Sequence, residues 1–219
     1  MATVEFIDPQ CPAVAVQNIF CIGRNYAAHI AELGNRPSGA PVVFLKPTSA
    51  ILHDGQTIEL PVFSKEVHFE TELVLLIGKG GKNIKEVDAL SHISGYGLGL
   101  DLTARDLQNK AKQDGLPWAV GKGFDHSACL SKFVIPSTLG APETLTFSLS
   151  INGVRRQFGE VRHMLYTVPH IIAYLSEIFT LQAGDLIYTG TPEGVGPLHT
   201  GDHLVLSLQD VLHAEFSVA

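Results

Sequence analysis

Cysteine is scarce in this 219-residue chain, which has three, Cys11, Cys21 and Cys129, and no Cys-x-x-Cys spacing. This pattern argues against a disulfide framework and predicts reduced, buried thiols in a cytosol-like compartment. Basic residues are also few: 15 lysines and arginines stand against 22 acidic residues, for a net charge of −7. Because nucleic acids and anionic membranes bind basic surfaces, we expect neither as a partner.

The sequence predicts neither a signal peptide nor a membrane-spanning segment. The N-terminal segment MATVEFIDPQ contains acids and a proline where a signal peptide has a basic and then an apolar stretch. The longest apolar runs, such as residues 73–77, fall far short of the roughly 18 residues that a bilayer requires. We therefore expect a cytoplasmic protein, or one of the mitochondrial matrix from which a transit peptide has been removed.

Short β-rich runs dominate the sequence. They predict strands at residues 42–45, 70–77, 98–101, 145–151, 185–189 and 203–208. Asn152-Gly153 predicts a hairpin turn. Because strands outnumber helices and rarely alternate with them, the pattern favours an α+β fold on a closed or rolled mixed sheet over a doubly wound one. No segment reads as a linker, so we predict one domain, residues 18–219, after an irregular N-terminal arm, residues 1–17.

Helix start and stop signals occur in a few places between these strands. They predict helices at residues 25–33, 86–91, 103–113 and 169–178. Asn25 is the predicted cap of the first helix and Gly34 its stop. The pattern Thr103-x-x-Asp106 resembles a capping box at the start of the third, and Pro169 suits the first turn of the last.

Three carboxylates lie in or at the end of predicted strands. Side chains alternate along a strand, so His68, Glu70 and Glu72 share one face, and the apolar run that follows indicates burial. Buried carboxylates require a metal ion or a basic partner; the alternative is an edge strand with solvated acids. Asp101 ends a glycine-rich apolar run and adds a third carboxylate, although alone it also fits a turn. An oxygen-only set suits Mg²⁺, Mn²⁺ or Ca²⁺ rather than Zn²⁺.

Candidate substrate-binding groups follow Asp101 in the sequence. Arg105 and Gln108 share a face near the start of a predicted helix, where donors suit a carboxylate or oxyanion. Lys122 lies between glycines and apolar residues, an unusual setting for a solvated lysine. Singly, each residue is more often a surface charge, but their clustering favours a site.

Two further segments are compatible with a ligand pocket. His29 and Glu32 lie at i and i+3 on a short predicted helix, where the carboxylate can orient the imidazole as a general base; an ordinary surface pair is the alternative. A helix this short is only marginally stable by itself, which suits a lid that becomes ordered over a ligand. The glycine-rich segment 190–196 lacks the pattern of a phosphate-binding loop. Thr189 or Thr191 offers a hydroxyl or backbone N–H to a carboxylate there, unless the segment is only a tight turn.

Several blocks of the sequence, in the same order, resemble the fumarylacetoacetate hydrolase family, especially its short single-domain branch of acylpyruvases and oxaloacetate decarboxylases. The blocks are residues 23–29, 68–73, 99–108, 115–118 and 184–196. The resemblance implies a mixed β-roll with short peripheral helices, a catalytic domain over residues 18–219 and a homodimer.

The same resemblance assigns roles to the candidate residues. It implies Mg²⁺ or Mn²⁺ held by Glu70, Glu72 and Asp101; a small 2-oxo acid bound by Arg105, Gln108, Lys122 and Thr191; and a lid pair, His29 and Glu32, that activates water. Lys122 is expected to be catalytic as well, by stabilising a pyruvate enolate. The sequence departs from close relatives at Phe69, where a histidine is common, and at Gly121 and Gly123, which are smaller than usual.

The expected function is metal-dependent cleavage of a carbon–carbon bond in small 2-oxo acids. Acylpyruvates such as acetylpyruvate would give a carboxylic acid and pyruvate, and oxaloacetate would lose CO₂. Two alternatives stay open within the family: hydrolysis of fumarylpyruvate or fumarylacetoacetate, and an isomerase or decarboxylase of aromatic degradation. A non-catalytic, metal-stabilised dicarboxylate-binding protein is the alternative from another class.

Overall fold

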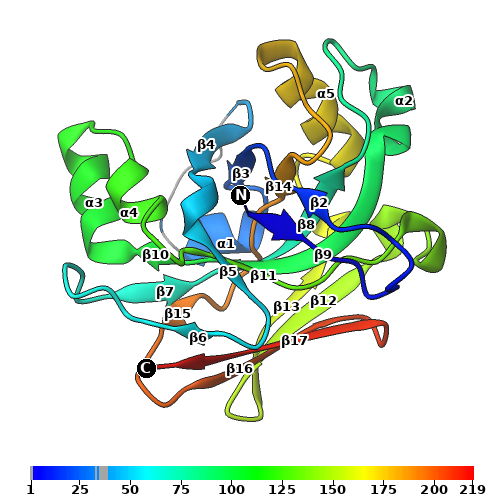
Figure 1. Cartoon of the computed structure of the whole chain (residues 1–219). Coiled ribbons are helices and arrows are strands. Elements are labelled where there is room, and N and C mark those ends of the chain that lie inside the picture. Colours follow the sequence, from blue (N-terminus) through cyan, green and yellow to red (C-terminus); the bar gives the residue numbers. More distant parts are fainter. Residues whose placement is uncertain (1, 33, 35–38) are drawn as a thin grey trace.

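A strongly curved mixed sheet forms the centre of the computed structural model, which describes residues 2–32, 34 and 39–219 (Figure 1). Its neighbouring strands are antiparallel except for the parallel pairs β14–β3 and β11–β5. In spatial order they are β4 (Val42–Lys46), β3 (Ile19–Gly23), β14 (Leu186–Tyr188), β8 (Thr71–Ile77), β9 (Ile93–Asp101), β11 (Ala128–Leu130) and β5 (Ile51–His53).

Three smaller sheets complete the β structure. One packs below the central sheet in Figure 1 and contains, in order, β13 (Val154–Glu160), β12 (Thr146–Ile151), β16 (His203–Leu208), β17 (Leu212–Val218) and β6 (Thr57–Ile58). Another has the order β10 (Thr103–Ala104), β7 (Val67–Phe69) and β15 (Gly196–Pro197), and the last pairs β1 (Thr3–Val4) with β2 (Val14–Ala15). The predicted α+β fold on a rolled mixed sheet is confirmed.

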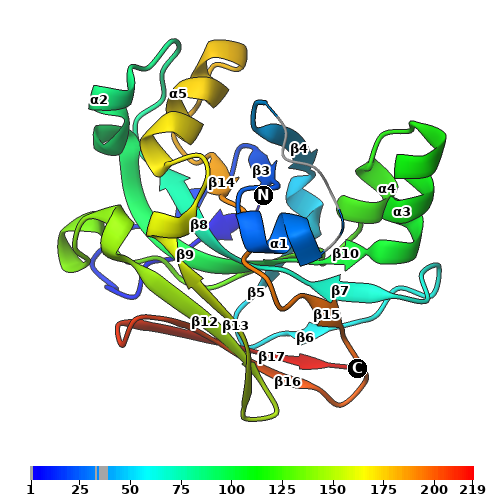
Figure 2. The ribbon, with the colours of Figure 1, turned by 180° about the vertical axis from the view of Figure 1, so that it is seen from behind.

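The α-helices are short and lie at the periphery. They are α1 (Ala27–Glu32), α2 (Glu86–Ala89), α3 (Arg105–Asp114), α4 (Ala119–Lys122) and α5 (Val168–Ile178), with 3₁₀ turns at Thr48–Ala50, Leu90–His92, Pro136–Thr138, Pro142–Thr144 and Val161–His163. Figure 2 shows α1 between the α2–α5 pair and the α3–α4 pair. Among the helices of the described residues, none is long and apolar enough to cross a bilayer.

Most predicted element boundaries agree with the structure, but the capping box predicted at Thr103 does not form. Pro169 lies in the first turn of α5, Asn152 and Gly153 both have positive φ in the β12–β13 hairpin, and Gly115 ends α3 at φ +67°. Thr103, however, belongs to β10, and α3 begins at Arg105 without a side-chain cap. The Thr103 hydroxyl donates to the Asp101 carbonyl, so it serves the neighbouring strand end rather than the helix.

Residues near α1 also differ from expectation. The predicted helix end at Leu33 lies outside the described residues, and α1 is described to Glu32. Asn25, predicted as its cap, is fully buried; its amide donates to the carbonyls of Tyr166 and Thr189 and accepts from the Tyr166 N–H. Asn25 thereby ties the start of α1 to two distant segments.

The central strand β8 is buried along its whole length, as its apolar run predicts. Leu73, Leu75 and Ile77 pack in the larger core between the sheets. Val74 and Leu76 face a second core, which the N-terminal arm covers with Val4, Phe6 and Val16 among others. Burial on both faces fixes β8 firmly, and so fixes the position of the acidic residues at its start.

Candidate active site

The acidic centre of the site lies where the chain passes from one sheet to another. Glu70 lies where β7 leads into β8, and Asp101 is the last residue of β9 before the chain enters β10. The Asp101 N–H donates to the Glu70 carbonyl at 2.8 Å, which holds the two crossings together. Glu70, Glu72 and Asp101 therefore each place a carboxylate oxygen within 4.8 Å of the others, and all are buried.

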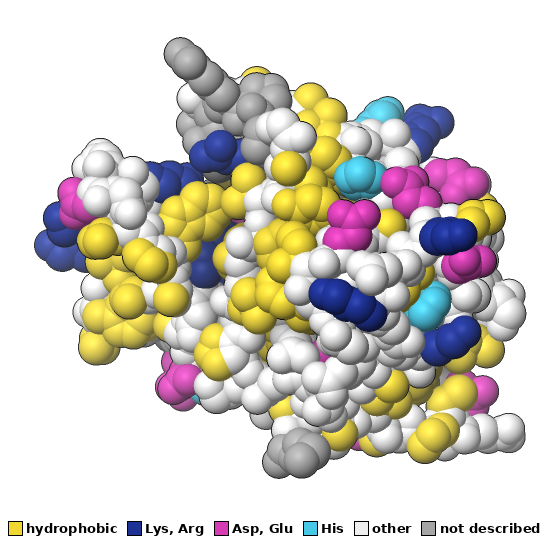
Figure 3. Space-filling view, turned by 90° about the horizontal axis from the view of Figure 1, so that it is seen from above, with side chains coloured by type: hydrophobic (Ala, Val, Ile, Leu, Met, Phe, Trp, Pro, Cys, Tyr) yellow, Lys and Arg dark blue, Asp and Glu magenta, His cyan; other side chains and the backbone are white. Residues whose placement is uncertain are grey.

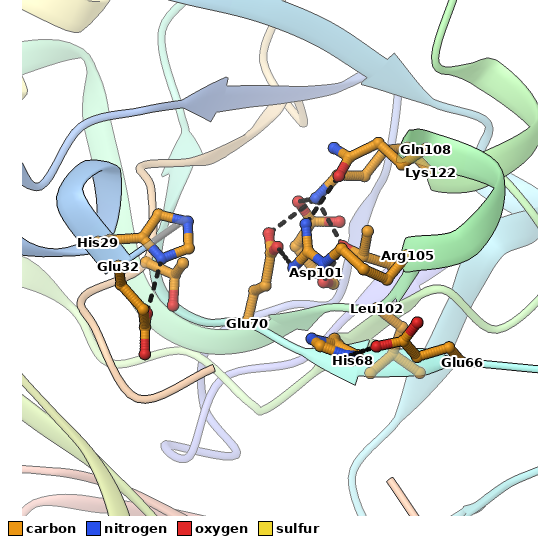
Figure 4. Close-up of polar contacts among 12 residues, drawn as sticks. His29, Glu32, Glu66, His68, Glu70, Asp101, Leu102, Arg105, Gln108 and Lys122 are labelled. Atoms are coloured by element: carbon orange, nitrogen blue, oxygen red, sulfur yellow. Dashed lines mark hydrogen bonds and ion pairs between the residues drawn. The ribbon is translucent and has the colours of Figure 1, made fainter. Parts of the chain in front are cut away.

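His68 does not join this cluster, although strict alternation predicts it on the same face. Its Nε2 lies 2.8 Å from Glu66 Oε1 (Figure 4). Glu70 belongs to neither β7 nor β8, so the period of two along one strand does not extend from His68 to Glu72.

Buried cations surround two of the carboxylates. Lys122 in α4 donates to Glu70 at 2.7 Å, to Asp101 at 2.5 Å and to the Thr103 hydroxyl at 2.7 Å. Arg105 at the start of α3 bonds to the other oxygen of Glu70. The basic partners that the sequence left as one alternative are thus present for Glu70 and Asp101.

Lys46 is a further buried cation, which the sequence analysis missed. It ends β4, lies 2.8 Å from Asp101 Oδ1, and donates to the backbone carbonyls of Leu102 and Lys122. A signal was available, because Lys46 ends an apolar strand in the same way as Asp101 does.

The carboxylates differ in their electrostatic setting. Burial acts to raise the pKa of Glu70, but Lys122 and Arg105 outweigh it and hold that pKa well below its usual value. Burial, reinforced by Asp101 and Glu70, raises the pKa of Glu72 well above its usual value. Among the described residues no cation contacts Glu72, which accepts a hydrogen bond from the Gly190 N–H at 2.7 Å. Glu72 is therefore the least compensated charge of the centre.

A divalent cation fits this donor set. Glu72 is buried and, among the described residues, has no cationic contact, although its carboxylate lies within 4.8 Å of the other two. An uncompensated buried carboxylate beside two others is expected where a metal ion supplies the missing positive charge. Carboxylate oxygens alone suit hard cations such as Mg²⁺ and Mn²⁺.

One face of α3 presents donors to the cavity. Arg105 Nη1 donates to Gln108 Oε1 at 2.7 Å, so the amide N–H groups of Gln108 are the part that can bind a ligand carboxylate. Arg105 Nε is buried without a hydrogen-bond partner among the described residues, which leaves a second donor. Gly121 lets α4 approach this face, because a Cβ there would lie 3.1 Å from the Gln108 nitrogen.

His29 and Glu32 lie across the cavity from this cluster, on α1 (Figure 4). His29 Nδ1 is 3.4 Å from Glu32 Oε2, so the predicted pair is in contact. Burial lowers the pKa of His29, although Glu70 and Glu32 oppose the shift, and the ring is therefore neutral at pH 7. A neutral imidazole with a carboxylate on Nδ1 can accept a proton at Nε2.

The segment after β14 closes the site and carries Thr191. Gly190 has φ +103°, and a Cβ there would lie 2.7 Å from the Asn25 Cβ, so only glycine fits. The Gly194 N–H donates to Glu32 at 3.0 Å, which joins this segment to α1. Thr191 is buried and lines the cavity.

Gln157, a buried residue of β13, holds this segment and was not predicted. Its amide donates to the Thr191 hydroxyl at 2.9 Å and to the Pro192 carbonyl at 3.0 Å, and accepts from the Thr71 N–H at 2.9 Å. Because the Thr191 oxygen accepts from Gln157, its own proton is free to point to a ligand.

A single cavity contains every predicted site residue except Glu32, which contacts His29 at its edge. The space that water-sized groups can occupy inside it is about 30 Å³, within about 410 Å³ of non-protein space that includes open solvent. Its lining adds residues that the sequence analysis did not select: Ile22, Gly23, Arg24, Phe44, Lys112 and Trp118.

Fold and site together define a class of protein: a mixed β-roll whose sheet crossings bring an acidic triad and buried cations into one cavity. The chain belongs to the fumarylacetoacetate hydrolase family, since residues 18–219 match the family described as Fumarylacetoacetate (FAA) hydrolase C-terminal.

Similar proteins include enzymes that act on 2-oxo acids. The mitochondrial oxaloacetate tautomerase FAHD1 of Mus musculus is 42% identical over 202 residues, 92% of this chain and 91% of the mouse protein. Oxaloacetate tautomerase YcgM of Escherichia coli is 44% identical over 193 residues, 88% of each chain. The fumarylpyruvate hydrolase of Pseudomonas aeruginosa, solved with Mn²⁺ and pyruvate, is 35% identical, with a TM-score of 0.94 over 100% of this chain and 95% of the other.

Proposed function

We propose that this protein is a divalent-metal-dependent enzyme that cleaves a carbon–carbon bond in small 2-oxo acids through an enolate. The observation that carries the proposal is the joint presence, in one cavity, of an acidic triad, a cluster of carboxylate-binding donors and a neutral histidine paired with a glutamate. A non-catalytic binding protein needs only the acidic triad and the carboxylate-binding donors. The general-base pair favours a catalyst.

Glu70, Glu72 and Asp101 would hold Mg²⁺ or Mn²⁺, which when bound supplies Lewis-acid polarisation of the 2-oxo group. Arg105 and Gln108 donate to the substrate carboxylate, and the Thr191 hydroxyl, which lines the same cavity, adds a donor. These groups orient the 2-oxo acid so that its acyl carbonyl carbon faces His29 on α1.

The reacting groups follow from this orientation. His29, with Glu32 on its other nitrogen, takes a proton from water, and the water oxygen bonds to the acyl carbonyl carbon. The bond from that carbon to the pyruvate methylene then breaks, and its electron pair passes into the pyruvate enolate. Lys122, a cation whose pKa Asp101 and Glu70 raise against the effect of burial, stabilises the enolate charge. His29 returns the proton to carbon and yields pyruvate.

Oxaloacetate can use the same cavity. Loss of CO₂ leaves the same pyruvate enolate, so it requires the donors and Lys122 but no activated water. A second candidate is keto–enol interconversion of oxaloacetate, which the names of the mouse and E. coli relatives favour. That reaction also passes through an enolate and needs a proton carrier such as His29.

Substrate assays with the purified protein test the proposal. Pyruvate release from acetylpyruvate, fumarylpyruvate and oxaloacetate is measured with Mg²⁺, with Mn²⁺ and with a chelator, and the decay of enol-oxaloacetate absorbance is followed in parallel. We expect metal-dependent pyruvate release that oxalate, a planar mimic of the enolate, inhibits. Absorbance decay without pyruvate from any substrate would favour the tautomerase, and no turnover at all would favour the binding protein.

A further inference from the structure

An aromatic wall runs through the cavity beside the predicted catalytic lysine. The rings of Phe44 and Trp118 lie 5.9 Å apart, and both line the cavity. Lys122 Nζ lies 4.9 Å from the centre of the Phe44 ring, and Lys112 Nζ lies 5.4 Å from the centre of the Trp118 ring. The wall therefore has one ammonium group at the acidic centre and another farther along.

Lys112 belongs to the same helix face as the substrate-binding donors. Arg105, Gln108 and Lys112 are spaced i, i+3 and i+7 on α3, which places them in one row, and all line the cavity. With a rise of about 1.5 Å per residue, Lys112 lies roughly 10 Å along the helix from Arg105. Figure 3 shows basic side chains on the side of the molecule that carries α3, next to exposed hydrophobic side chains.

The surroundings of Lys112 favour an anion. Within the described part of the chain, Lys112 contacts no carboxylate, and its ammonium group lies over the Trp118 ring. Burial, with Arg105, Lys122 and Arg24 nearby and only Glu70 opposing, lowers the pKa of Lys112 to about 8. A half-buried cation among cations is stabilised when a negative group joins it.

We propose that Lys112 binds a second carboxylate of the substrate, so that the site selects acylpyruvates whose acyl group ends in a carboxylate. The proposal rests on the proposed function, in which Arg105, Gln108 and Lys122 hold the 2-oxo acid end. The carbon chain lies against Phe44 and Trp118, and the far carboxylate reaches Lys112 at the other end of the wall. Acetylpyruvate has no group for this subsite, whereas fumarylpyruvate does.

The test compares two substrates that undergo the same hydrolysis and differ at the far end. Lys112→Met keeps the length of the side chain and removes the charge, and Lys112→Arg retains the charge. Lys110→Met is the matched control, because Lys110 lies on the exposed face of α3 and pairs with Asp114. Values of kcat and KM are measured for fumarylpyruvate and acetylpyruvate with Mn²⁺.

We expect Lys112→Met to lower kcat/KM for fumarylpyruvate about 10- to 100-fold more than for acetylpyruvate, mainly through KM, as for loss of a hydrogen bond to a charged group. Lys112→Arg should restore most of the difference, and Lys110→Met should leave the ratio of the substrates unchanged. Equal losses for both substrates, or no loss, would overturn the subsite.

A binding measurement separates failure of the subsite from failure of the proposed function. If wild-type protein hydrolyses neither substrate, the hydrolase assignment fails, and calorimetry with Mn²⁺ then decides the subsite alone. The ligands are 2-oxoglutarate and 2-oxopentanoate, which differ in the terminal carboxylate. Tighter binding of 2-oxoglutarate that Lys112→Met abolishes supports the subsite; equal binding of both ligands by wild-type protein overturns it.

Discussion

At the scale of single residues, Lys122 has two roles that one substitution can separate. It bridges Glu70 and Asp101, and it is the proposed partner of the enolate. Lys122→Met should lower kcat by about 10²–10³-fold, with a smaller rise in KM, because the charge matters most in the transition state. It should also destabilise the fold, by less than the roughly 3–5 kcal/mol of a fully unpaired buried charge, because Arg105 still contacts Glu70 and Lys46 still contacts Asp101. Steady-state kinetics and denaturant unfolding measure the two effects; a KM effect alone would contradict the enolate role.

His29 makes a prediction about pH. Because burial lowers the pKa of His29 below the usual value of 6.5, the base form persists to a lower pH than in a free histidine, and hydrolysis should decline only as pH falls below 6.5. The unfolded chain takes up this proton first, so the stability contributed by the neutral ring is present above pH 6.5 and is lost as pH falls. The prediction is tested by measuring kcat/KM for acetylpyruvate as a function of pH. An acid limb centred above pH 6.5 would show that the His29 ring is not the base.

At the scale of elements, a substitution in the His29–Glu32 pair of α1 should slow hydrolysis more than decarboxylation. Glu32→Gln keeps an acceptor for the Gly194 N–H, so the contact between α1 and the 190–196 segment remains, but it removes the charge beside His29. Acetylpyruvate hydrolysis should fall by about 10²–10⁴-fold, as for loss of a general base. Oxaloacetate decarboxylation should fall noticeably less. Equal losses, measured on one purified variant, would assign the pair to lid closure instead.

The contact between β13 and the 190–196 segment should matter for binding. Gln157→Leu removes the donor to Thr191 and leaves the buried Thr71 N–H without its acceptor, at a cost of roughly 1–3 kcal/mol in stability. KM for 2-oxo acids should rise because the Thr191 hydroxyl is no longer oriented. A double-mutant cycle with Thr191→Val tests this: the KM effects should not add, whereas full additivity would mean that Gln157 does not act through Thr191.

At the scale of the whole molecule, a bound metal should stabilise the fold. The candidate ligands lie where β7 passes into β8 and β9 ends, so the ion would join two sheets through buried groups. Mn²⁺ at about 100 times its dissociation constant should add about 2.7 kcal/mol to the free energy of unfolding. Glu72→Gln retains the acceptor for the Gly190 N–H, and should abolish this gain without destabilising the metal-free protein. A Tm that does not respond to Mn²⁺ in wild-type protein would contradict the metal site.

Much of the molecule could be predicted from local patterns. The apolar run of β8, the Asn152-Gly153 turn and the ends of α5 depend on nearby residues, and all agree with the structure. The resemblance to the family, carried by blocks spread along the chain, is confirmed by the match over residues 18–219. Side chains that converge on the cavity could be selected because their types and spacing suit a carboxylate-binding metal enzyme.

Long-range packing decided the rest. His68 does not join the acidic cluster because the chain changes sheet at Glu70. Thr103 is a strand residue rather than a helix cap because β10 pairs with β7. Lys46 and Gln157 reach the site from strands far away in the sequence, so no local spacing could relate them to Asp101 or Thr191. The sequence by itself determined which strands form and which residue types the site uses. Only the tertiary structure decided which charges meet, because a buried ion pair depends on distances between segments that the fold alone brings together.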